Sequence, residues 1–175
     1  MHMPAFDTVA LGQAFGIVLS FVGFFIYLAK TRRGILTAKL ICDVGYCIQQ
    51  IMIGATTGAL INAIAIFREI VFYYRGDKQW ASHRFWLYLF VVVMGLSPLP
   101  TWMGPVSLLP AVGSMVAVIS FYCQNTQHTR ILGFLAMIPW LLYAMIITNY
   151  GVILTTVIQL ISAALGYIRD SRKKV

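Results

Sequence analysis

Two carboxylates stand inside strongly apolar stretches of this sequence, where acidic side chains are rare. Asp43 and Glu69 are flanked by long runs of hydrophobic residues, and two basic residues, Lys39 and Arg68, share those runs. An ionised side chain at the centre of a membrane helix costs at least about 2.5 kcal/mol on insertion scales, so it needs a partner or a function. Asp43, Glu69 and Arg68 are therefore candidates for ion or proton coupling. A buried ion network that ties helices together is the alternative, and a salt bridge to Arg68 would argue against proton coupling.

Uncharged polar and aromatic residues recur at helical spacing around these charges. Tyr46 and Gln50 follow Asp43 on one helical stripe, and Asn62 precedes Glu69 on another. Aromatic faces can stack against a ring while side-chain amides fix its polar groups, which is the usual composition of a small-molecule site. We therefore predict a solute-binding cavity lined by Tyr46, Gln50, Asn62, Trp140, Thr156 and Gln159. The alternative for Asn62 and Gln159 is hydrogen bonding between helices.

The elements that must position these side chains are predicted to be transmembrane helices. The chain has 175 residues, of which 60% are hydrophobic and only 10% charged, and its mean hydropathy is +0.83. A soluble domain would carry about a quarter charged residues. Apolar segments that could cross a bilayer are predicted at residues 9–29, 35–54, 57–75, 85–102, 105–123, 131–148 and 151–168. The fourth is the weakest, because Ser97, Pro98 and Pro100 interrupt it.

The basic residues lie in alternate links between these segments. Lys and Arg occupy the links after the first, third, fifth and seventh segments, while the links after the second, fourth and sixth contain none. By the positive-inside rule, the basic links and the C-terminus face the cytoplasm and the N-terminus lies outside. Topology thus explains the net charge of +8, and we do not expect nucleic acid as a partner.

The first three segments align with the last three at a constant offset of 94 residues. Matching pairs are Ser20 with Ser114, Tyr73 with Tyr167, and Arg75 with Arg169. Helix-loosening residues coincide as well, for example Gly45 with Pro139. The predicted fold is an all-α membrane protein of seven transmembrane helices, with two parallel three-helix repeats (residues 1–78 and 104–175) joined by a linking helix (residues 79–103). Such repeats are a transporter architecture with the substrate site between the halves, and a duplication that only built a stable bundle is the alternative.

Other chemistries receive little support. The histidines, His2, His83 and His128, lie at the N-terminus or in links, apart from the carboxylates. The sequence has none of the glycine and serine motifs of phosphate-binding loops and hydrolases, and no metal-ligand spacing. We therefore expect no enzymatic activity, no cofactor and no bound metal. Gly12 and Gly16 form a GxxxG pair, which predicts close helix packing.

Two stretches carry a resemblance to a known family. The segments ALINAIAIFRE at residues 59–69 and LLPAVGSMVAVISFY at residues 108–122 are similar to the YgjV family of bacterial inner-membrane proteins. The resemblance implies a location in the bacterial plasma membrane. The three-one-three layout also resembles that of SWEET sugar facilitators and PnuC vitamin transporters. SWEET-like halves favour a proline in each of their first two helices, and only the second half of this chain has them, as Pro110 and Pro139.

The sequence supports two functional hypotheses. The first is a small-solute transporter or facilitator whose two halves rock about a site at the middle of the membrane. The second is a non-transporting membrane protein, either a ligand-sensing receptor or an assembly subunit. A central polar cavity reached by both Asn62 and Gln159 would favour the transporter. The expected partners are the lipid bilayer and a small solute, and a homo-oligomer is compatible with the sequence.

Overall fold

The computed structural model describes residues 5–102 and 104–172, and within them every regular element is a helix. The long helices are α1 (Ala5–Ile26), α2 (Arg32–Met52), α3 (Thr56–Tyr73), α6 (Leu108–Tyr122), α7 (Thr126–Ile146) and α8 (Tyr150–Arg172). The shorter ones are α4 (Gln79–Ser82), α5 (Phe85–Leu96) and the 3-10 helices η1 (Leu99–Thr101) and η2 (Pro105–Ser107). In this described part, six segments are long and apolar enough to cross a membrane, and Phe85–Thr101 is a shorter apolar segment. The prediction of seven apolar helical segments, with the fourth the weakest, is confirmed.

One difference from the predicted bounds, at the start of α7, changes where an arginine lies. The sequence predicted that this segment begins at residue 131, with Arg130 in the preceding link. The helix instead begins at Thr126, because the Asn125 side chain accepts a hydrogen bond of 2.9 Å from the backbone N–H of Gln127 and caps it. Arg130 therefore lies inside the helix and is only 1% exposed.

Helices that are 94 residues apart in the sequence correspond in their bounds and in the turns that follow them. Both α2 and α7 contain 21 residues, and their first residues differ by that offset. Each is followed by a turn with one residue in the left-handed region, Gly54 with φ 76° and Thr148 with φ 54°. In both turns the next residue donates its N–H to a carbonyl five positions back, at 2.8 and 2.9 Å. Threonine adopts this backbone conformation only at a cost, so packing rather than residue type fixes the second turn.

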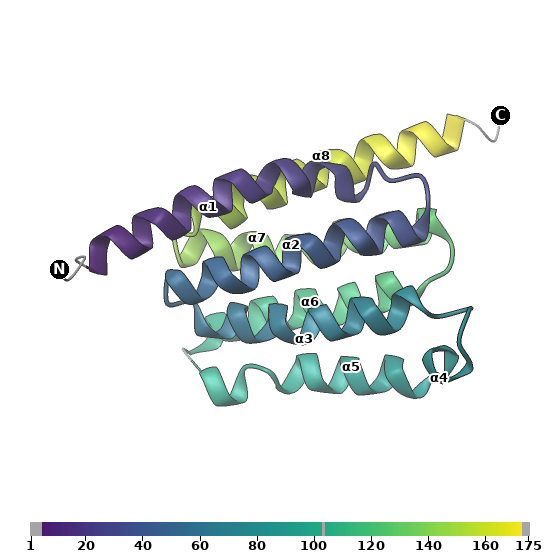
Figure 1. Cartoon of the computed structure of the whole chain (residues 1–175), viewed down its shortest axis with the longest axis horizontal. Helices are drawn as coiled ribbons and strands as arrows, with labels where there is room; N and C mark the ends of the chain where they lie inside the picture. Colours follow the sequence, from purple (N-terminus) through teal and green to yellow (C-terminus); the bar gives the residue numbers. More distant parts are fainter. Residues whose placement is uncertain (1–4, 103, 173–175) are drawn as a thin grey trace.

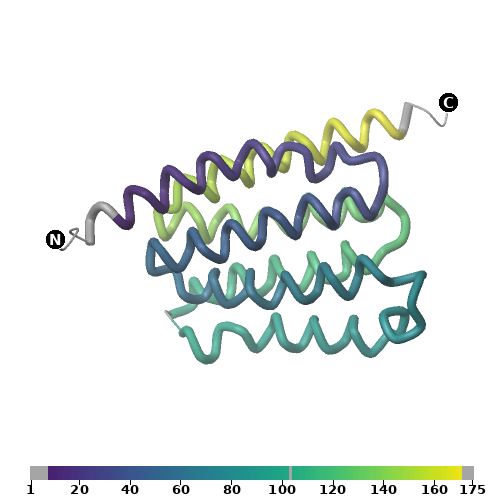
Figure 2. The backbone as a smooth tube through the Cα atoms, viewed as in Figure 1, coloured from purple at the N-terminus to yellow at the C-terminus, as the bar shows by residue number. Residues whose placement is uncertain are grey.

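The six long helices form a closed ring. In order around it, α1 contacts α2, followed by α3, α6, α7 and α8, and α8 contacts α1 again. Figure 1 shows α1, α2 and α3 in front of α8, α7 and α6, and Figure 2 shows the chain crossing back and forth between two ends. Helix α5 lies outside the ring, against α6 and α3. We call the end with the Lys- and Arg-containing links the basic end (right in Figure 1), and the end with the α2–α3 and α7–α8 turns the opposite end.

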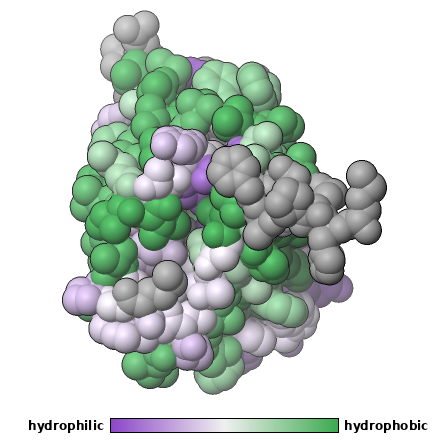
Figure 3. Space-filling model, turned by 90° about the vertical axis from the view of Figure 1, so that its left-hand side faces the viewer, coloured by the Kyte–Doolittle hydropathy of each residue, from purple (hydrophilic) through white to green (hydrophobic). Residues whose placement is uncertain are grey.

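Hydrophobic side chains cover the outside of the ring and polar ones lie within it. Phe21, Phe25 and Phe67 are between 62% and 72% exposed, whereas Asp43 and Glu69 are at most 1% exposed. Figure 3 looks at the opposite end and shows hydrophobic residues around the periphery, with hydrophilic and intermediate ones toward the middle. This distribution suits a protein whose outer surface contacts lipid and whose polar groups must be satisfied internally.

Helices α1 and α8 approach closely at Gly16 and Gly151. A Cβ atom added at Gly16 would lie 3.0 Å from the Gly151 Cα, and one added at Gly151 would lie 2.7 Å from the Gly16 Cα. The neighbouring atoms are backbone, which cannot rotate away. One turn earlier, a Cβ at Gly12 would lie 2.9 Å from the Ile53 side chain. The close packing predicted for the Gly12 and Gly16 pair is therefore present.

This contact makes a testable prediction. We expect Gly151→Val to lower the free energy of unfolding by about 1–3 kcal/mol, because the added side chain must push α1 and α8 apart. Gly95→Ala in α5 is the matched control, since its Cβ would meet only the flexible Met115 side chain, at 3.3 Å. Equilibrium unfolding of the purified protein in detergent measures both variants, and equal stabilities would contradict the assigned contact.

Candidate functional site

The ring of helices encloses a cavity of about 80 Å³. Helices α2, α3, α6, α7 and α8 all contribute lining side chains, and α1 contributes through Tyr27, which follows its last residue. The lining runs from Gln50, near the opposite end of α2, to Tyr27 at the basic end. The cavity therefore lies along the axis of the bundle, between the halves predicted from the sequence.

Most of the residues predicted for the site line this cavity. They are Asp43, Tyr46, Gln50, Asn62, Arg68, Trp140, Thr156 and Gln159. The remaining one, Glu69, is not a lining residue, because its carboxylate is buried and forms an ion pair with Arg68. Asn62 on α3 and Gln159 on α8 both reach the cavity, which is the arrangement that the transporter hypothesis requires.

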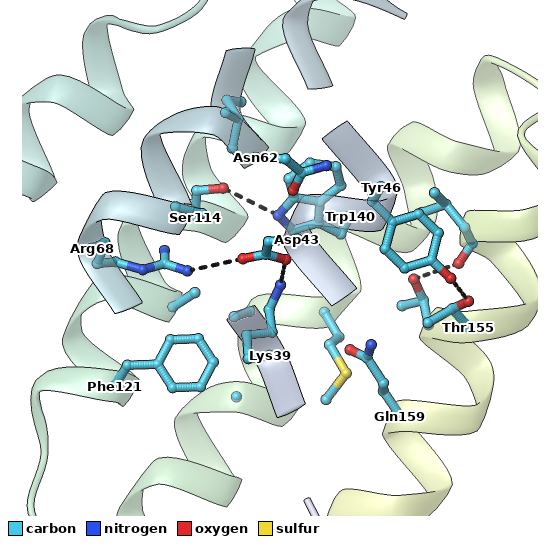
Figure 4. Close-up of a pocket in the computed structure, with 18 of the residues that line it drawn as sticks. Lys39, Asp43, Tyr46, Asn62, Arg68, Ser114, Phe121, Trp140, Thr155 and Gln159 are labelled. Carbon is cyan, nitrogen blue, oxygen red and sulfur yellow. Dashed lines mark hydrogen bonds and ion pairs between the residues drawn. The ribbon is translucent and has the colours of Figure 1, made fainter. Parts of the chain in front are cut away.

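Four charged side chains of α2 and α3 form an ion network at one side of the cavity, and Figure 4 shows three of them, Lys39, Asp43 and Arg68. Lys39 pairs with Asp43 Oδ1, one turn further along α2. Arg68 Nη2 lies 2.5 Å from Glu69 Oε1 and 3.8 Å from Asp43 Oδ2. The Arg68 guanidinium also lies over the Phe121 ring, 5.2 Å from its centroid. Two positive and two negative charges balance, so the network has no formal net charge.

The rest of the lining is neutral. The Tyr46 hydroxyl donates to the Gly16 carbonyl at 3.3 Å and also contacts the Thr155 hydroxyl. The Thr156 hydroxyl donates to the carbonyl one turn earlier in α8, at 2.7 Å. The Trp140 indole N–H donates to a serine hydroxyl of α6 at 3.2 Å. Because these groups already have partners within the protein, Tyr46, Thr156 and Trp140 offer a ligand mainly their apolar and aromatic surfaces.

Several buried polar atoms around the cavity have no hydrogen-bond partner among the described residues. They are Asp43 Oδ2, Gln50 Oε1, Asn62 Nδ2 and Arg68 Nε. Buried polar groups are nearly always hydrogen-bonded, so unpaired atoms gathered at one cavity indicate a place for a ligand or water. Gln50 differs from the others, because its amide oxygen is wedged against Gly58 of α3.

Comparison with known proteins places this site in a family. A family model described as a bacterial inner membrane protein, Imp-YgjV, matches residues 10–174. The chain belongs to the YgjV family. No curated protein and no solved structure matches the chain. The match covers all six helices of the ring, and the resemblance seen at residues 59–69 and 108–122 is confirmed. This YgjV-family chain is therefore a multi-pass protein of the bacterial inner membrane.

Sequence reasoning missed several features of the YgjV-family site. Tyr27 and Phe121 are 94 residues apart, both are at most 2% exposed, and together they line the basic end of the cavity. The internal repeat could have found this pair, since both residues are aromatic at corresponding positions. No such signal exists for Gln49, whose Nε2 donates to Asn149 Oδ1 at 2.9 Å and joins α2 to the start of α8.

The arrangement can recognise a ligand. Its polar atoms can hold a ligand by hydrogen bonds, and its aromatic faces can cover a ring. Within residues 5–102 and 104–172, no group of three or more His, Cys, Asp or Glu is placed to hold a metal ion.

Proposed function

We propose that this YgjV-family protein is a small-solute transporter or facilitator of the bacterial inner membrane, in which two three-helix halves alternate access to the central cavity. The observation that carries the proposal is a polar cavity on the axis of the ring, reached by both Asn62 and Gln159. Polar groups at membrane depth are costly and mark substrate pathways. A receptor or an assembly subunit needs no such cavity between its halves.

The order of helices around the ring supports two related halves. Moving three places around it takes α1 to α6, α2 to α7 and α3 to α8, as a two-fold axis along the bundle would do. The offset of 94 residues also relates the bounds of α2 and α7 and the left-handed turns after them. Parallel repeats related in this way allow rocking of one half against the other around a fixed site.

At the basic end, an arginine of the second half binds the residues that directly follow α1. Arg130 donates from Nε to the Tyr27 carbonyl at 3.0 Å and from Nη2 to the Ala29 carbonyl at 3.1 Å. Its Nη1 donates to the Gly166 carbonyl of α8 at 3.1 Å. The free carbonyls at a helix C-terminus attract cations, and α1 has no basic residue in its own last turn. One guanidinium therefore ties α1 to α7 and α8.

The first half holds α6 in a corresponding way. Arg32 donates from Nε to the Cys123 carbonyl and from Nη2 to the Phe121 carbonyl, both at 3.0 Å. These two carbonyls lie 94 residues after those of Ala29 and Tyr27. Arg32 stands one turn earlier in α2 than Arg130 stands in α7. The bonded carbonyls thus correspond between the halves although the arginines themselves do not.

A second pair of arginines adds to these links at positions that do correspond. Arg169 donates to the Leu28 carbonyl at 3.1 Å, and Arg75 donates to the Tyr122 carbonyl. We call Arg32, Arg75, Arg130 and Arg169 the arginine latches. At the opposite end the contacts between the halves use neutral groups, such as the Gln49 and Asn149 amides. We infer that this structure is the state closed at the basic end, and that opening there requires release of the latches.

The ion network favours a facilitator without proton coupling. Arg68 forms ion pairs with both Asp43 and Glu69, so neither carboxylate stands alone in the cavity as a proton carrier would. Both carboxylates belong to the first half, and the positions 94 residues later are Met137 and Ala163. We therefore propose that the network holds α2 and α3 together, so that the first half moves as one rigid unit.

A solute that binds this cavity should stabilise the protein. At a concentration of about 100 times its dissociation constant, it should raise the free energy of unfolding by about 2.7 kcal/mol. Thermal unfolding of the purified protein against sugars, nucleosides, vitamins and amino acids measures this. We expect the shift to be clearly smaller in Asn62→Ala and Gln159→Ala, and to be unchanged in Gln124→Ala, which removes an exposed amide outside the cavity. An undiminished shift in both cavity variants would contradict the assigned site.

Alternating access has a test that needs no substrate. In a variant without its native cysteines, Gln159→Cys places a thiol in the cavity wall. Membrane-impermeant thiol reagents applied to right-side-out and inside-out vesicles should label it from both sides. Labelling from one side only would favour the receptor or assembly subunit over the transporter.

A further inference from the structure

The charge balance of the cavity limits the solutes that it can take. Lys39, Asp43, Arg68 and Glu69 have two formal charges of each sign and form ion pairs with one another. The other titratable lining residues, Tyr27 and Tyr46, are neutral phenols. A solute with a net charge would bring an uncompensated charge into a buried site, which costs several kcal/mol. The cavity is therefore matched to a solute without net charge.

The unpaired polar atoms give the recognition pattern. Asp43 Oδ2 lies 3.8 Å from Arg68 Nη2 but has no hydrogen-bond partner, so it can accept one, and Asn62 Nδ2 can donate one; both side chains are at most 5% exposed. Both come from the first half, and Figure 4 shows them with Trp140 close together at the centre of the cavity. The residues 94 positions later are Met137, which is apolar, and Thr156, whose hydroxyl is already bonded. A ligand thus meets a donor and an acceptor on the α2–α3 side and apolar or aromatic surface on the α7 side.

The volume sets the size of the solute. One buried water occupies roughly 10–15 Å³ of such a cavity, so about 80 Å³ holds roughly five to eight groups of that size. This space suits a single small ring or a short chain. A disaccharide or a nucleoside would require the ring of helices to widen.

We propose that the cavity binds a small uncharged lactam or ureide, in which an N–H donor stands beside a carbonyl acceptor. The solute N–H donates to Asp43 Oδ2, the solute carbonyl accepts from Asn62 Nδ2, and the ring lies against Trp140. Such an edge satisfies both unpaired atoms at once, and leaving either unpaired costs binding free energy. The proposal rests on the proposed function, because it names the class of solute that would be carried.

The experiment compares probes that differ in one feature each. Uracil and hydantoin carry the N–H and carbonyl edge, the N,N′-dimethyl derivative of uracil lacks its donors, and orotate adds a carboxylate to the same ring. We expect uracil or hydantoin at millimolar concentration to raise the unfolding temperature and the other two to have no effect. Asn62→Ala should weaken binding about tenfold, which corresponds to the loss of one hydrogen bond. Gln124→Ala should bind like the parent.

A second readout protects the test against a variant that folds poorly. Uracil should slow thiol labelling of Ala136→Cys, a lining position outside the recognition pattern, with Asn62 and Gln159 intact, and the dimethyl derivative should not. The proposal is overturned if orotate, an amino acid zwitterion or the dimethyl derivative binds as well as uracil, or if neither uracil nor hydantoin binds. Binding without uptake into proteoliposomes would refute transport and leave the ligand class standing. Uptake of a charged solute through the same cavity would support transport and refute the proposed ligand class.

Discussion

Replacing Arg68 with glutamine is expected to lower the free energy of unfolding by about 3–5 kcal/mol, the range for breaking a buried ion pair. Arg68 is 2% exposed and is a cationic partner of both Asp43 and Glu69. Without it, the Glu69 carboxylate loses its cationic partner in the interior and Asp43 keeps only Lys39. The loss of stability arises mainly from leaving a buried carboxylate without a partner. The lost attraction counts for less, because the attraction within a buried ion pair is roughly cancelled by the cost of removing its charges from water.

A rescue variant separates this explanation from a simple packing defect. Equilibrium unfolding in detergent should show that Arg68→Gln/Glu69→Gln recovers a large part of the loss, since the second change removes the stranded charge. Arg84→Gln, at an exposed arginine, should be close to the parent. If Arg68→Gln/Glu69→Gln is less stable than Arg68→Gln alone, the unpaired Glu69 carboxylate is not the cause of the lost stability.

Arg130→Gln is expected to have the second-largest effect, on stability and on access to the cavity. The substitution removes bonds to the Tyr27, Ala29 and Gly166 carbonyls, together with the ion pair to Asp170. Hydrogen bonds to a charged donor contribute about 1.5–3 kcal/mol each, and part of this returns when water reaches the freed carbonyls. We expect a loss of about 3 kcal/mol and labelling of Gln159→Cys from the basic end that is about tenfold faster.

The matched control for this prediction is another arginine at the same end. Arg33 pairs with Asp77 in an exposed ion pair whose side chains are 51% and 46% exposed, and such surface pairs contribute about 0–1 kcal/mol. Arg33→Gln should therefore leave both stability and labelling nearly unchanged. Arg32→Gln should behave like Arg130→Gln, because it releases the corresponding carbonyls of α6. If both latch variants lose stability while labelling stays at the parental rate, the latches are structural bonds and not a gate.

The sequence by itself determined the helical segments and most of the cavity lining. A bilayer accepts only spans of limited length with their backbone bonds made internally, so the apolar runs predict the helices directly. Helical periodicity then groups side chains by face, which is why Asp43, Tyr46 and Gln50 were assigned to one stripe and all reach the cavity. The bounds of the segments differ by a few residues, for example at α7, where the Asn125 cap lengthens the helix.

Only the tertiary structure decided the partners of these side chains. The sequence placed Arg130 in a link, whereas it is buried in α7 and bonded to carbonyls of α1 and α8. Every residue has the same backbone carbonyl, so no pattern of residue types predicts that an arginine will bind a particular one. The same holds for the ring order and for the unpaired atoms of Asp43 and Asn62. A side chain's partners depend on how separate helices pack, and periodicity within one helix carries no information about its neighbours.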